Sequence, residues 1–390
     1  MHDFKKIYFK SYDYAKLKTI AMKIIFFSII IFLLVGLYSC FLKNDKKNNG
    51  FNTIIQDTSI IETKPTEDLY IDLKKNEIEK KVDVFVDGKM FTSLKWDENI
   101  FKPVLHPIKT ATGKTITRGF PLTPKPGERA DHMHHVGNWF NYGNVNGIDF
   151  WGNGHTGEKI ENGGEIILTD IDTIIPGLNK AVLVTNAKWV DANRNELLNE
   201  KTEYHFMANG KTRIIDRIVT LTALEKDITF KDTKEGLFAI RVARELELPV
   251  RERTTIVGKN LKLKKWRKTT IKNRSGQYKN SEGIYGRNVW GTRAKWMALF
   301  GDFQEVKITI FVSDLPSNPN FPTYWHAREY GLFAANPFGV KDFTKSSREL
   351  NYKIHANQTI TFKYRIIIGS NKHFTDNELN NYTLNFAQKY

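Results

Sequence analysis

Cysteine is almost absent from this chain of 390 residues, which contains only Cys40. We expect Cys40 to carry a lipid, for the reason given below, and this would leave no thiol for a disulfide, a metal site or a nucleophile. The sequence also has no P-loop, no dinucleotide fingerprint and no Gly-x-Ser-x-Gly elbow. These absences argue against a nucleotide cofactor and against the chemistry of a serine-elbow esterase.

Long apolar runs are scarce, and the clearest one covers residues 24–38. It is shorter than the roughly 20 residues of a membrane-spanning helix but suits the apolar region of a secretory signal. The four residues that end in Cys40 resemble a bacterial lipobox. We predict a signal segment over residues 1–40 with an upstream mis-start before Met22, and an exported, membrane-anchored lipoprotein of the periplasm or outer membrane. The alternative is an uncleaved N-terminal anchor helix.

Residues 41–67 are polar and rich in Lys, Asn, Asp and Thr. Such a composition cannot bury enough apolar surface to order itself, so we predict a disordered tether. Residues 68–390 are then expected to form one large domain.

The formal net charge of the chain is +16. Nucleic acid is not an expected partner of an exported protein, whereas an anionic polysaccharide is. Residues 251–274 carry ten Lys or Arg against one acid, Glu252, with Trp266 among them. This basic insertion, about residues 251–280, is either a solvated loop or a groove that binds uronate or sulfated sugars by charge and stacking.

Apolar and polar residues alternate over most of the chain after residue 68. Residues 82–86 and 90–94 flank an Asp87-Gly88 dipeptide, which is typical of a hairpin. Comparable runs cover residues 166–168, 181–185, 203–207, 213–221, 237–242, 306–312 and 359–368. This pattern predicts an all-β fold, a large antiparallel β-sandwich. One short C-terminal helix is also predicted, with Thr375 and Glu378 as its capping box.

Several segments together resemble a bacterial family labelled PmoA-like, or "methane oxygenase". They are HP at residues 106–107, TRGFP at 117–121, DHMHH at 131–135, NGIDFW at 146–151, DTKEG at 232–236, DLPSNP at 314–319 and PTYWHAREYGLFAANPFG at 322–339. The resemblance implies a β-sandwich like the supersandwich of galactose mutarotases, and a role in carbohydrate catabolism. A methane monooxygenase subunit crosses the membrane several times, whereas this chain has a single apolar segment, so the oxygenase activity is not expected.

Half of the ten histidines lie between residues 106 and 157, namely His106, His132, His134, His135 and His155. Imidazole titrates near neutral pH and is the commonest metal ligand, so their crowding predicts proton transfer or metal binding. If residues 131–136 are extended, His132 and His134 share one face and His135 lies on the other. Bending at the flanking glycines would weaken that assignment.

We predict catalytic roles for His134, His135 and His106 together with Asp131. A divalent metal would be held by His132, His134 and His155. The alternative is that some or all of these histidines only form hydrogen bonds with buried backbone groups.

A second group of candidates lies in residues 322–339. His326 follows three prolines, so we expect it in a loop, where binding residues are often displayed. Aromatic planes beside His and Arg are typical of a sugar subsite. The predicted substrate-binding residues are Tyr324, Trp325, Trp151, Arg118 and Arg328. The alternative is that the aromatic residues form a core plug under a long loop.

Carboxylates complete the predicted site. Glu235, next to Gly236, is either part of a charged hairpin turn or a catalytic carboxylate in a cleft. Two carboxylates from Asp131, Asp149, Asp314 and Glu235 could hydrolyse a glycoside. Alternatively, a histidine could abstract a proton next to a uronate carboxyl group, with an arginine stabilising the charge that develops.

We therefore predict an exported, lipid-anchored carbohydrate-active enzyme, of glycoside hydrolase or polysaccharide lyase type, with a His-rich cleft that includes His326 and Glu235. The first alternative is a non-catalytic glycan-binding surface lipoprotein. The second is a metal-dependent oxidoreductase.

Overall fold

The computed structural model describes residues 68–158, 160–268, 272–303 and 305–390. The predicted signal segment, Cys40 and the predicted tether lie outside the described residues. Within the described part of the chain, no helix combines the length and the hydropathy needed to cross a membrane.

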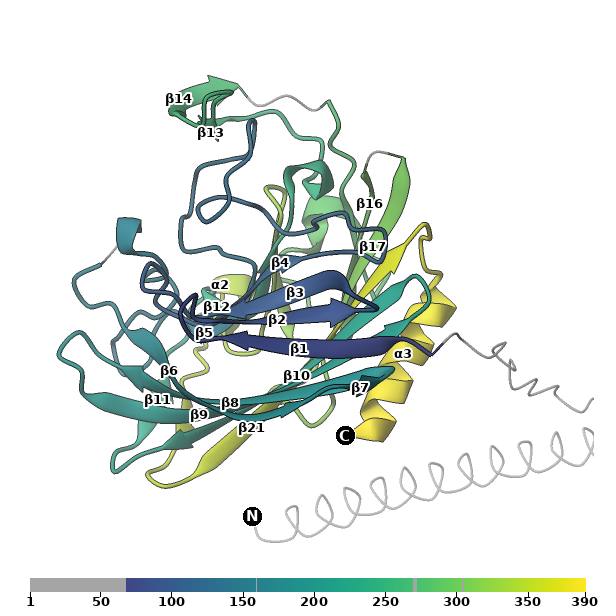
Figure 1. Ribbon diagram of the computed structural model, residues 1–390. Helices are drawn as coiled ribbons and strands as arrows, with labels where there is room; N and C mark the ends of the chain where they lie inside the picture. The colour runs from purple at the N-terminus through teal and green to yellow at the C-terminus, as the bar shows by residue number, and fades with distance from the viewer. Residues whose placement is uncertain (1–67, 159, 269–271, 304) are drawn as a thin grey trace, which may run out of the picture. The chain divides into compact units, whose positions relative to one another are not determined.

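The described strands form two large antiparallel sheets that are stacked as two layers (Figure 1). This confirms the predicted all-β sandwich. The first sheet has nine described strands, in the spatial order β18 (Tyr324–Arg328), β19 (Leu332–Asn336), β12 (Gly236–Arg241), β5 (Asn138–Tyr142), β4 (Val104–Ile108), β3 (Lys89–Lys95), β2 (Lys81–Val86), β1 (Tyr70–Asn76) and β7 (Gly177–Leu178).

The second sheet has eight strands over the same described residues. Their spatial order is β15 (Gln277–Asn280), β16 (Trp296–Phe303), β17 (Val306–Ser313), β21 (Thr359–Ser370), β10 (Thr212–Ala223), β9 (Glu196–Asn209), β8 (Lys180–Val190) and β6 (Glu165–Ile175). Two short antiparallel ribbons lie outside these sheets, β11 (Ile228–Phe230) with β20 (Tyr352–Ile354) and β13 (Arg253–Val257) with β14 (Leu263–Lys268).

The described helices are few. The predicted C-terminal helix is α3 (Asp376–Lys389), and its capping box is confirmed because Thr375 and Glu378 cap each other's backbone N–H groups. Its apolar side packs with Trp296 and Phe311 on the outer face of the second sheet. The remaining helical turns are α2 (Val340–Thr344), η2 (Thr156–Glu158), η3 (Arg244–Leu246) and η4 (Gly286–Val289).

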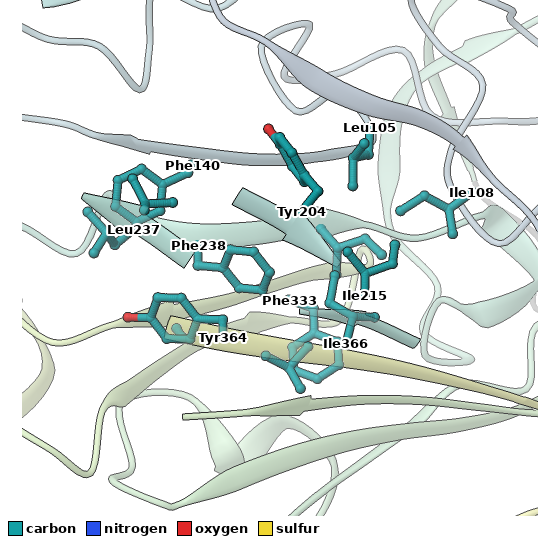
Figure 2. Packing of buried hydrophobic residues seen from close by; sticks show 14 of the residues in the cluster. Leu105, Ile108, Phe140, Tyr204, Ile215, Leu237, Phe238, Phe333, Tyr364 and Ile366 are labelled. Atoms are coloured by element: carbon teal, nitrogen blue, oxygen red, sulfur yellow. The ribbon is translucent and has the colours of Figure 1, made fainter. Parts of the chain in front are cut away.

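The main hydrophobic core lies between the two sheets (Figure 2). Phe238 of the first sheet stacks on Tyr364 of the second, with ring centroids 4.7 Å apart. Phe140 and Phe362 make a similar contact at 5.5 Å. Burying each such side chain contributes about 1.5–3 kcal/mol to folding. The described part of the chain therefore has its main hydrophobic core between the two sheets.

The two ends of the first sheet differ in burial. Strand β2 alternates between buried and half-buried residues, as expected for a sheet with one covered face. Strands β5, β12 and β19 are buried at every position. At this end, loops therefore cover the outer face of the sheet, and those loops carry most of the predicted site residues.

Candidate functional site

A row of four side chains crosses the outer face of the first sheet. The register pairs His326 on β18 with Ala334 on β19, Ala334 with Ala239 on β12, and Ala239 with Trp139 on β5. Paired residues on neighbouring strands share a face. Trp139, Ala239 and Ala334 belong to a small apolar cluster that is separate from the main core. The two small alanines form the floor between the larger His326 and Trp139 side chains.

The loop of residues 129–135 is folded around the guanidinium group of Arg118. This group donates hydrogen bonds to the backbone carbonyls of Asp131 (2.7 Å), His132 (2.7 Å) and His135 (3.0 Å). The segment is therefore a turn, so of the two alternatives for residues 131–136 the bent one holds and the extended one does not. His132 has a positive φ of 45°. The physical reason is that the buried guanidinium of Arg118 donates hydrogen bonds to carbonyl groups near both ends of the segment, which an extended chain would hold too far apart.

Asp131 is the counterion of this loop. Its carboxylate accepts hydrogen bonds from Arg118 (3.0 Å), Arg241 (2.9 Å) and Arg129 (3.3 Å). Burial opposes ionisation, but Arg241, His132 and Arg118 outweigh it and hold the pKa of Asp131 far below its usual range. Asp131 and Arg118 thus position the loop. The catalytic role of Asp131 and the substrate-binding role of Arg118 stay predictions.

The turn brings three histidine rings together. The ring centroids of His132, His134 and His135 lie 4.4 to 5.6 Å apart. His135 is buried, with its Nδ1 3.1 Å from Nη1 of Arg241. Because arginine can only donate, His135 Nδ1 accepts and the ring is neutral. Burial is the main reason that the pKa of His135 lies well below its usual value, and its predicted catalytic role is replaced by a structural one.

His106 lies on β4 and is completely buried. Its Nε2 is 3.1 Å from the hydroxyl of Thr123. Burial is the main reason that the pKa of His106 falls to about 3. Burial alone does not decide its role, because His135 and His326 are each only 2% exposed. The catalytic role of His106 stays a prediction. Of the catalytic histidines predicted from the 106–157 stretch, only His134 is half-buried.

His326 is the best-defined proton-transfer group at the site. Its Nδ1 lies 2.9 Å from the backbone carbonyl of Lys234, and because a carbonyl only accepts, Nδ1 carries the proton. Burial, partly offset by Glu235, lowers the pKa of His326 to about 4. The ring is therefore neutral at neutral pH, and Nε2 keeps its lone pair.

Two carboxyl groups near His326 have pKa values that are shifted in opposite directions. Oε2 of Glu235 lies 3.9 Å from His326 Nδ1 and Oε1 lies 2.8 Å from Nζ of Lys234. Burial raises the pKa of Glu235, but His326 and Lys234 lower it more, so the net shift is downward. Burial raises the pKa of Asp149, and the charge of Glu235 adds to this. Such divergence is the pattern of an acid and a base.

Aromatic rings surround His326. Trp151 stacks on it with centroids 6.4 Å apart, and Trp290 meets it edge-on at 6.4 Å. The guanidinium of Arg328 lies over Trp290 at 5.7 Å and over Tyr330 at 6.0 Å. The fold therefore brings His326, Glu235, Arg328 and Trp151 together, although they come from three separate segments of the chain.

Strand alternation divides the other predicted aromatic residues. His326 lies on β18 and not in a loop as predicted, because the segment pairs with β19. Its neighbour Trp325 therefore points the other way and is completely buried in the main core. Tyr324 is covered by Phe343, with centroids 5.4 Å apart. Neither ring offers a free face to a sugar, which corrects their prediction as substrate-binding residues.

The predicted metal ligands do not assemble. Among the described residues, no group of three or more His, Cys, Asp or Glu side chains is arranged to hold a metal ion. Nδ1 of His155 instead accepts a hydrogen bond from the backbone N–H of Gly157 at 2.9 Å.

Sequence reasoning missed Lys102 and Trp290. Nζ of Lys102 donates to the backbone carbonyl of His134 at 2.8 Å and lies 5.4 Å from the ring of Trp139. Trp290 directly follows η4. Each is isolated in the sequence from the other site residues, so no local motif could have identified them. Only the tertiary fold brings them to the site.

Two of the buried histidines, His106 and His326, predict a loss of stability in acid. The pKa values of His106 and His326 fall from 6.5 to about 3 and about 4 on folding. Below pH 6.5 the unfolded state therefore binds more protons than the folded state, and the free energy of unfolding decreases as the pH falls. Near pH 4 we expect a loss of about 3 kcal/mol per histidine. Urea denaturation at pH 7 and pH 4.5 measures this decrease in the free energy of unfolding. If His106→Gln lost as much stability between these two pH values as the unaltered protein, His106 would not be a cause of the decrease.

Comparisons with known proteins identify the family. Residues 81–383 match the model of DUF6807, a family of unknown function. The chain belongs to this family. The match carries no oxygenase description and takes the place of the PmoA-like assignment. No curated protein matches the chain in sequence.

The chain is also similar, at low TM-scores, to several solved structures. The chain is similar to the galactosidase domain of the α-galactosidase-sucrose kinase AgaSK, with a TM-score of 0.35, 10% identity and coverage of 77% of this chain and 41% of that one. It is similar to the GH36 α-galactosidase AgaB of Geobacillus stearothermophilus, with a TM-score of 0.35, 8% identity and coverage of 77% and 41%. It is also similar to a galactose mutarotase related enzyme of Lactobacillus acidophilus, with a TM-score of 0.26, 10% identity and coverage of 78% of this chain and 98% of that one. The chain thus spans about two fifths of the galactosidase chains.

Proposed function

We propose that this protein is an exported carbohydrate-active enzyme, lipid-anchored through Cys40, that abstracts a proton from an acidic sugar with His326. The observation that carries the proposal is the state of His326: its tautomer is fixed by the carbonyl of Lys234, and burial keeps it neutral. A general base needs such an unprotonated nitrogen at working pH. Arg328, on the same face of β18, is the group that would hold the carboxylate of the sugar.

The reaction would be a β-elimination. Nε2 of His326 takes the proton from the carbon next to the uronate carboxylate. The released electron pair forms a carbon–carbon double bond, and the bond between the neighbouring carbon and the leaving oxygen breaks. The leaving oxygen takes up a proton from solvent water. Arg328 stabilises the negative charge that grows on the carboxylate during the step.

Hydrolysis of a glycoside is the second candidate function. It rests on a different observation, the opposite pKa shifts of Asp149 and Glu235. In that reaction Asp149 would protonate the leaving oxygen, and Glu235 would activate water or attack the sugar. The hydrolase would produce a new reducing end and no double bond, so the products distinguish the two reactions.

The test uses the soluble domain of residues 68–390 with polyuronates, sulfated polysaccharides and neutral polysaccharides. Unsaturated products and new reducing ends are followed separately. We expect unsaturated products from a polyuronate. Reducing ends without unsaturation would replace elimination by hydrolysis. Binding of a polysaccharide without any product would contradict both reactions and favour a glycan-binding lipoprotein. Activity that depends on added metal would favour the oxidoreductase alternative or a metal-assisted reaction.

A further inference from the structure

The β13–β14 hairpin projects beyond both large sheets (Figure 1). Strand β13 is joined to residues 127–130, at the start of the histidine loop. The N–H of Gly127 donates to the carbonyl of Val257 at 2.8 Å, and the N–H of Ala130 donates to that of Thr255 at 2.9 Å. The hairpin is therefore held through β13 up to the residue before its turn, while β14 remains exposed. All six residues of β14 are exposed to solvent.

Exposed apolar side chains gather on this hairpin. Of the nine large hydrophobic residues that are exposed in the described part of the chain, three are Leu261, Leu263 and Trp266. Their exposed fractions are 52%, 51% and 76%. A soluble surface normally scatters such residues singly, so three of them within six positions mark an interaction surface.

Cations surround these apolar side chains. Residues 259–268 contain six Lys or Arg and no acid. They are Lys259, Lys262, Lys264, Lys265, Arg267 and Lys268. None of the six has an ion-pair partner among the described residues. Their mutual repulsion is thus not relieved within the domain, and an anionic partner would relieve it.

The backbone at Trp266 points to the same conclusion. Trp266 has a φ of 52°, in the left-handed region that disfavours large side chains. It lies at the irregular register of the hairpin, between the pairs of Thr254 with Arg267 and of Ile256 with Lys264. This conformation presents an indole ring to solvent at a cost to folding, and no packing within the domain accounts for it.

We infer that this hairpin docks the domain onto an anionic phospholipid surface. Leu and Trp side chains enter the interface between head groups and acyl chains, while Lys and Arg bind the phosphates. The two leucines decide between a membrane and an anionic polysaccharide. An anionic sugar polymer can stack on Trp266 and pair with the cations, but it has no apolar layer that could bury Leu261 and Leu263. The inference does not depend on the reaction proposed above or on a lipid at Cys40.

Docking would also orient the candidate site. The hydroxyl of Thr254 in β13 lies 3.5 Å from the Asp131 carboxylate, which holds the histidine loop. A hairpin seated in the membrane surface would therefore keep the histidine loop close to that surface. For an enzyme on a membrane, this arrangement favours substrates that are attached to or lie along the same surface.

The test measures binding of the soluble domain of residues 68–390, without an anchor, to sedimenting vesicles. One vesicle set contains only phosphatidylcholine, and the other contains one quarter phosphatidylglycerol. We expect binding at least tenfold stronger to the anionic vesicles. The triple variant Leu261→Ser, Leu263→Ser, Trp266→Ser should lose most of this binding. A matched control replaces Leu178 and Leu384, which are 61% and 58% exposed elsewhere, and should bind like the unaltered domain.

A second measurement does not depend on the triple variant. Brominated lipids quench a tryptophan that enters the acyl region, so the unaltered domain should be quenched and Trp266→Phe should not. Equal binding by the triple variant would overturn the inference. An absence of quenching in the unaltered domain would also overturn it. A third contrary result would be a domain that does not bind vesicles but binds a soluble polyuronate equally well with and without the leucine substitutions. The last result would assign the hairpin to polysaccharide binding.

Discussion

Replacing His326 by asparagine is expected to lower kcat/KM on the productive polysaccharide by about 10²- to 10⁴-fold. The asparagine amide can still donate to the carbonyl of Lys234, which Nδ1 of His326 contacts at 2.9 Å, but it has no counterpart of Nε2. The variant therefore removes the base and keeps the local hydrogen bond. Steady-state kinetics and a thermal melt measure the two effects separately.

The pH dependence of kcat/KM tests the same group. His326 is the active base only when neutral, so activity should rise as the pH increases through about 4 and stay level towards neutral pH. His373→Asn, which alters a partly exposed histidine in the connection between β21 and α3, is the matched control and should change neither kcat/KM nor its pH dependence. An activity that stays within threefold in His326→Asn would show that another group transfers the proton. His134 would then be the next candidate, because it is a half-buried member of the histidine cluster, as is His132.

Replacing Asp131 by alanine should have the largest effect on stability. The substitution leaves Arg118 and Arg241 buried without their shared carboxylate, and both guanidinium groups are almost completely inaccessible to solvent. Removing one partner of a buried ion pair costs about 3–5 kcal/mol. For a domain of this size we expect Tm to fall by roughly 10 °C. Calorimetry or a fluorescence melt measures this shift.

The matched control is Glu98→Ala, which removes an exposed carboxylate 2.7 Å from Lys80. An exposed pair contributes about 0–1 kcal/mol, so Tm should hardly change. If Asp131→Ala kept its Tm and lost turnover, Asp131 would belong to the chemistry and not to the support of the loop. His326→Asn and Asp131→Ala therefore separate a group that acts on substrate from one that positions its neighbours.

The fold was largely predictable because its signals are local. The Asp87-Gly88 hairpin joins β2 to β3, and the runs predicted as strands fall on β6, β8, β9, β10, β12, β17 and β21. Thr375 begins the terminal helix as predicted. Each of these features depends on side-chain alternation or on turn and capping chemistry within a few residues.

The site was only partly predictable, because burial and pairing of distant segments decide it. His106 and His135 were expected at the site from their residue type, and the loops over the outer face of the first sheet cover both. Trp325 and His326 are adjacent in the sequence, yet strand pairing of β18 with β19 sends one into the core and the other to the outer face. The three prolines before them had suggested a loop.

By itself, the sequence determined the sandwich architecture, the capped terminal helix and the segments that hold the candidate residues, since these follow from local pattern and composition. Only the tertiary structure decided that Arg118 and Asp131 fold the histidine loop and that Ala239 and Ala334 form the floor beside His326. It also decided that Glu235 lies close enough to Asp149 to raise the pKa of Asp149. Solvent exclusion and Coulomb interactions act through space, so their strength depends on distances that the order of residues along the chain does not contain.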